Sequence, residues 1–121
     1  MKLPLEYRWL KAHNFKLFTP WYLIDPMNSD DLRQGYKKET GKDILPFARR
    51  QDIDDLAGFE IIDSVVQSKV ITVHLTWSGR QEREGWPRTR NSTDLLDWLN
   101  EVAIPDTRDW MTEEELEDLE K

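Results

Sequence analysis

The chain of 121 residues contains no cysteine. Disulfides, thiolate metal sites and a cysteine nucleophile are therefore excluded, and the composition suits a reducing compartment. The chain also lacks an apolar run near the length of about 20 residues that spans a bilayer, and its first residues lack the apolar core of a signal peptide. We therefore expect a soluble cytoplasmic protein with one domain, residues 1–121.

The chain has fewer basic than acidic side chains, 17 Lys and Arg against 24 Asp and Glu, which gives a net charge of −7. The imbalance lies at the C-terminal end, because residues 106–121 hold eight acidic and two basic side chains, whereas the preceding residues hold 16 and 15. A chain without clustered Lys and Arg is poorly suited to binding phosphate backbones. We therefore expect no direct binding to nucleic acid and no membrane binding, and the acidic segment favours a basic partner protein.

Short elements alternate along the chain. Helical spacing and capping side chains predict helices near residues 5–10, from residues 28–31 to Thr40, from Ser92 to a stop at Pro105, and from Thr112 onward. Strand patterns cover residues 21–25, 44–50, 56–62 and 70–77, and residues 79–90 look like a connection. Short connections imply antiparallel neighbours. The pattern predicts an α+β domain, a small antiparallel sheet packed on one side by helices.

Six tryptophans are more than a small core requires. Four lie in apolar patterns and are expected in the core: Trp9, Trp21, Trp77 and Trp98. Trp86 and Trp110 lie in polar surroundings, where an aromatic side chain either anchors an interface or covers the edge of the core.

The segment PFARRQDIDDLAGF, residues 46–59, crowds two arginines and three aspartates between two aromatic residues. Asp52 and Asp54 begin like a calcium loop, but Ala57 falls where that loop needs glycine. We expect a hairpin in which Arg49 or Arg50 pairs with an aspartate, and no metal or cofactor. A small metal-dependent enzyme built on these aspartates is the alternative.

Catalytic motifs are not found. The chain has neither a His-Glu-x-x-His zinc helix nor a Gly-x-Ser-x-Gly nucleophile elbow. A triad that includes His74 could form only through folding, and period-two alternation instead places His74 on the polar face of its strand. We therefore expect a protein that is not an enzyme and has no catalytic residues.

The order of several landmarks resembles the SUKH superfamily, which includes a yeast cell-wall regulator family and many bacterial immunity proteins. The resemblance covers about residues 44–103 and rests on structural motifs. It lacks the glycine-centred opening turn of many members. The landmarks are Leu-Pro-Phe-Ala-Arg-Arg at 45–50, the Asp-rich turn at 52–55, Leu-Ala-Gly-Phe at 56–59, the strand with Val-x-x-Val-His at 70–74, the Gly-to-Trp connection at 79–86, and Leu-Leu-x-Trp-Leu at 95–99.

The resemblance implies a SUKH-like fold and an immunity-type protein that sequesters and neutralises a cognate bacterial toxin, often a nuclease. The alternative is a regulatory or scaffolding module that binds an endogenous protein. Acidic charge and aromatic anchors suit either role, and the acidic tail has a plainer interpretation as a solvated surface helix. The candidate partner-binding residues are Asp52, Asp54, Asp55, Trp86, Trp110, Glu113, Glu114 and Glu115.

Overall fold

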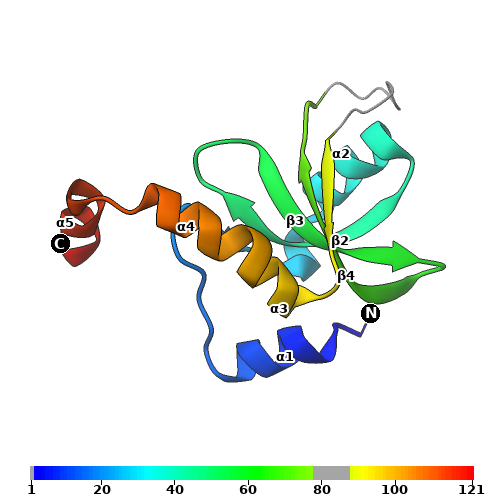
Figure 1. Cartoon of the computed structure of the whole chain (residues 1–121). Helices are drawn as coiled ribbons and strands as arrows, with labels where there is room; N and C mark the ends of the chain where they lie inside the picture. Colours follow the sequence, from blue (N-terminus) through cyan, green and yellow to red (C-terminus); the bar gives the residue numbers. More distant parts are fainter. Residues whose placement is uncertain (1, 78–87) are drawn as a thin grey trace.

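The computed structural model describes residues 2–77 and 88–121 (Figure 1). In this part of the chain, five strands pair in chain order as an antiparallel sheet, which confirms the α+β class. The elements are α1 (Leu5–Ala12), β1 (Trp21–Leu23), the 3₁₀ turn η1 (Pro26–Asn28), α2 (Asp30–Thr40), β2 (Asp43–Arg50), β3 (Asp55–Ile62), β4 (Val65–His74), β5 (Thr89–Ser92), α3 (Leu95–Trp98), the π-helical turn η2 (Leu99–Ala103), α4 (Ile104–Trp110) and α5 (Glu113–Glu120).

Local chemistry explains the central hairpins. Asp63 and Ser64 both have positive φ, 50° and 66°, as a tight two-residue turn between twisted antiparallel strands requires. Pro46 cannot donate to a strand ladder, and it lies where the register of β2 shifts against β3. Gly58 lies opposite Pro46, and a Cβ there would lie 3.0 Å from the Leu45 carbonyl oxygen. The bulge and the close approach together accommodate proline within a paired strand.

Helices cover both faces of the sheet, so the prediction of helices on one side was wrong. On one face α1 and α3 enclose a core that includes Phe47, Phe59 and Trp98. On the other face α2 buries Leu32 and Tyr36 against a second cluster. Strand β4 shows why the expected alternation is incomplete, since buried residues lie on both of its faces from Val70 to Val73. The sheet is therefore the shared middle layer of two cores.

Of the four tryptophans expected in the core, two are buried and two are exposed. Trp21 and Trp98 are buried and meet edge to face, with ring centroids 5.1 Å apart. Trp9 and Trp77, by contrast, are 64% and 49% exposed, so their assignment to the core was wrong. Helix α1 packs through Tyr7, which places Trp9, two residues later, on the opposite side of the helix. Trp77 follows the end of β4 and rests on α2.

The C-terminal helical region differs from the prediction at both boundaries. The cap is Asp94, whose carboxylate accepts from the Asp97 N–H at 2.8 Å, whereas Ser92 belongs to β5, an unpredicted polar edge strand. Pro105 does not end the helix, because α3, η2 and α4 follow one another without a break. Proline lacks an N–H and crowds the preceding turn, and the wide π turn lies directly before it. The helical path therefore continues to Trp110.

Candidate protein-interaction site

The Asp-rich segment forms the expected hairpin turn between β2 and β3. Arg50 donates two hydrogen bonds to the Asp52 carboxylate, from Nε at 2.9 Å and from Nη2 at 3.0 Å. Arg49 lies 3.7 Å from Asp54. The predicted pairing of arginine with aspartate is therefore confirmed.

The ion pair between Arg50 and Asp52 shifts the pKa of both side chains. The hydrogen bonds from Arg50 lower the pKa of Asp52 below its ordinary value of 3.8, although partial burial opposes them. Burial by itself would lower the pKa of Arg50, but the bonds to Asp52 and the charge of Asp106 raise it overall. Both side chains remain charged at neutral pH, and their charges largely offset each other.

Asp106 joins this turn to the helical layer. Its Oδ2 accepts from the Trp21 indole N–H at 2.8 Å and lies 3.3 Å from Arg50 Nη1. Thr107 adds a weaker bond of 3.4 Å to the Phe18 carbonyl. Sequence reasoning missed Asp106 as an internal contact, because it lies among other acidic residues. The contact fixes α4 against β1 and the hairpin.

Asp55 has a different partner from its neighbours in the turn. It lies opposite His74 in the β3–β4 ladder, and its Oδ1 is 2.7 Å from His74 Nδ1. His74 is partly exposed and lies on the sheet face that carries Thr72. The three aspartates proposed for partner binding therefore each face a basic side chain of the protein itself, which weakens the turn as an acidic surface.

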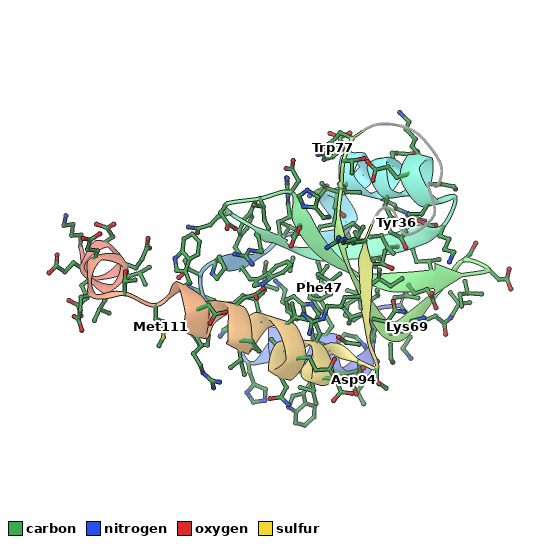
Figure 2. All side chains as sticks on the ribbon, turned by 45° about the horizontal axis from the view of Figure 1, so that its top comes forward. Tyr36, Phe47, Lys69, Trp77, Asp94 and Met111 are labelled. Carbon is green, nitrogen blue, oxygen red and sulfur yellow. The ribbon has the colours of Figure 1, made fainter. Side chains whose placement is uncertain are left out.

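Helix α5 is the acidic element that stands apart. The Thr112 hydroxyl caps it by accepting from the Glu115 N–H at 3.1 Å, as the sequence predicted. None of its residues is buried, and Figures 1 and 2 show it beyond the end of α4, with side chains projecting into open space. Within the described chain Glu113, Glu114 and Glu115 form no ion pair, whereas Asp118 lies 3.8 Å from Lys121.

An apolar edge runs along this acidic helix. Leu116 and Leu119 are 48% and 64% exposed and lie three residues apart, so they share one side of α5. Met111, labelled in Figure 2 at the junction with α4, is also exposed. A helix with an apolar edge and flanking carboxylates is suited to a groove that has an apolar floor and basic rims.

The structure places one of the two tryptophans proposed as interface anchors, Trp110, and does not describe the other, Trp86. Trp110 ends α4 and is half-buried, and its indole nitrogen is buried without a hydrogen-bond partner in the described part of the chain. It therefore covers the edge of the packed helical region more than it projects as an anchor. Trp86 lies outside the described residues, so the structure does not place it.

Over residues 2–77 and 88–121, no three His, Asp or Glu side chains are arranged to hold a metal ion. Within the same ranges, no helix has both the length and the apolar character needed to traverse a bilayer.

Comparison with protein-family models, with curated proteins and with solved structures finds no match to this chain.

Proposed function

We propose that this protein is a non-enzymatic, SUKH-like immunity protein that binds a cognate bacterial toxin with a basic surface and neutralises it. The observation that carries the proposal is α5, a capped acidic helix that projects from the body with an exposed leucine edge. A nuclease is one class of toxin with such a surface, because it must itself bind phosphate backbones.

The charge distribution supports α5 as the point of first contact. Six acidic residues and Lys121 give residues 113–121 a charge of −5 out of the total of −7, which leaves −2 for the rest of the chain. Long-range attraction between opposite charges accelerates encounter, and burial of an apolar edge slows release. Covering a toxin's surface requires no catalytic group in the covering protein.

The test is co-expression with the toxin encoded beside the gene for this chain, followed by binding kinetics with the two purified proteins at low and physiological salt. We expect protection from toxicity and an association rate that falls as salt rises. Glu114→Lys with Glu117→Lys should lower the association rate about tenfold or more and reduce protection.

The matched control is Asp31→Lys with Asp63→Lys, which makes the same change in net charge at exposed positions away from α5. It should keep protection and most of the association rate. If the α5 variant protected and bound as the unaltered chain does, the assignment of α5 would be wrong. Binding to an endogenous host protein without any protection would instead favour a regulatory or scaffolding module.

A further inference from the structure

A groove lies between α1 and the segment that follows β1. Its volume is about 560 Å³, within the range of clefts that hold several side chains or a small ligand. It is lined by Leu3, Tyr7, Arg8, Lys11, Leu23, Ile24, Asp25, Pro26 and Met27.

The groove combines an apolar lining with basic charge at its rim. Arg8 and Lys11 are exposed and form no ion pair within the described ranges. Arg8 Nε donates one hydrogen bond of 3.0 Å to the Leu3 backbone carbonyl. The acidic side chain in the lining, Asp25, is engaged locally, since it accepts from the Met27 N–H at 2.9 Å and from Asn28 Nδ2 at 3.1 Å. The rim can therefore receive carboxylates.

Helix α5 has the complementary pattern. Leu116 and Leu119 form its apolar edge, and the carboxylates nearest that edge by helical spacing are Glu113, Glu115 and Glu120. An eight-residue helix is marginal without a surface to pack against. The same chain therefore holds an acidic apolar-edged helix and a basic apolar-lined groove.

Helix α5 does not lie in the groove of its own copy, since none of its residues lines that groove. Only Met111 and Thr112 connect α4 to α5, and two residues span at most about 7 Å. The start of that connection is fixed, because Asp106 and Thr107 hold α4 against Trp21 and Phe18. Figure 1 shows α5 beyond the end of α4 and apart from α1.

We propose that α5 of one copy docks in the α1–β1 groove of a second copy, with its leucines on the groove lining and its carboxylates against Arg8 and Lys11. Because each copy has one helix and one groove, a reciprocal exchange closes as a twofold dimer. The dimer buries the surface that the proposed function assigns to the toxin. The inference rests on α5 as a recognition helix, and it makes toxin binding and self-association mutually exclusive.

The test is sedimentation equilibrium of the full chain from low micromolar to millimolar concentration at physiological salt. We expect the apparent mass to rise from 14.5 kDa toward twice that value. Truncation after Met111, Leu116→Ser with Leu119→Ser, and Arg8→Glu with Lys11→Glu should each keep the protein monomeric. Lys42→Glu, a charge reversal at an exposed lysine outside the groove, should still dimerise.

A charge swap provides the decisive comparison. A chain with Arg8→Glu and Lys11→Glu, mixed with a chain that has Glu113→Lys and Glu120→Lys, should form a heterodimer although each is monomeric by itself. A monomeric unaltered chain, or dimerisation that survives truncation or the groove reversal, would overturn the dimer. Protection from the toxin is measured separately on the groove variant, Arg8→Glu with Lys11→Glu, in which α5 is unaltered and undocked. Absence of protection by that monomer would contradict the proposed function and leave the dimer untouched.

Discussion

Trp98 is enclosed between the sheet and the helical layer, and its indole N–H donates to the Thr72 hydroxyl at 2.9 Å. Both side chains are buried, so water cannot replace either partner. The bond ties α3 to β4 across 26 positions of sequence. Here one polar contact fixes how a large aromatic side chain is oriented in the core.

Thr72→Val keeps the shape of the side chain but removes the acceptor, leaving a buried indole N–H without a partner. We expect the free energy of unfolding to fall by about 1–3 kcal/mol, as measured by chemical denaturation. Thr89→Val, on an exposed position of β5, is the matched control and should change it by less than about 0.5 kcal/mol. Equal effects of the two substitutions would show that the hydrogen bond does not contribute to the free energy of unfolding beyond an exposed side chain.

A two-bond ion pair, Arg33 with Asp43, joins α2 to β2 beside their apolar packing. Arg33 donates through Nε and Nη2 to the two carboxylate oxygens of Asp43, both at 2.7 Å. These bonds lower the pKa of Asp43 below its ordinary value of 3.8, against the opposing effect of partial burial. Because the pKa of Asp43 is lower in the folded state, the ion pair with Arg33 stabilises the fold above about pH 4. That contribution is lost as pH falls through the folded pKa of Asp43.

Asp43→Asn should therefore lower the free energy of unfolding by about 1 kcal/mol at pH 7. The difference from the unaltered chain should shrink below about pH 4 as Asp43 becomes protonated. Denaturation curves at several pH values measure this. The control is Asp118→Asn, which removes a fully solvated pair with Lys121 and should have no effect at any pH. A difference for Asp43→Asn that stayed constant down to pH 3 would contradict the assignment.

Elements also show where sequence patterns succeed. The end of α2 at Thr40, after which Gly41 has a φ of 73°, and the cap of α5 at Thr112 follow from local chemistry and were predicted. The passage of the helix through Pro105 was not, because proline is read as a stop unless the geometry of the preceding turn is known. Strand β5 was missed because its residues, Thr-Arg-Asn-Ser, carry no apolar alternation.

At the scale of the molecule, two cores share one sheet. Val70 and Val73 are both fully buried in β4, yet Val70 contributes to the core under α1 and α3, and Val73 to the core under α2. Neither core can lose its packing without disturbing the strands that the other also uses. We therefore expect the protein to unfold as one cooperative unit.

Val70→Ala and Val73→Ala form a matched pair on opposite faces of the same strand. Each should cost about 1–3 kcal/mol and shift the unfolding midpoint equally whether followed by tryptophan fluorescence or by far-ultraviolet circular dichroism. The buried tryptophans, Trp21 and Trp98, lie in the Val70 core. If Val73→Ala shifted the circular dichroism transition but left the fluorescence transition in place, the two cores would unfold separately.

The sequence by itself determined the class of the fold, the hairpin of arginines and aspartates, most element positions and the acidic character of the C-terminal segment. Each of these depends on residues close together in the chain, where periodicity, capping and turn chemistry act. The tertiary structure decided which side chains are left without partners. Trp21 and Asp106 are 85 positions apart, and their contact makes Asp106 part of the body while α5 stays exposed. Such pairings depend on how distant elements pack, which no local pattern encodes.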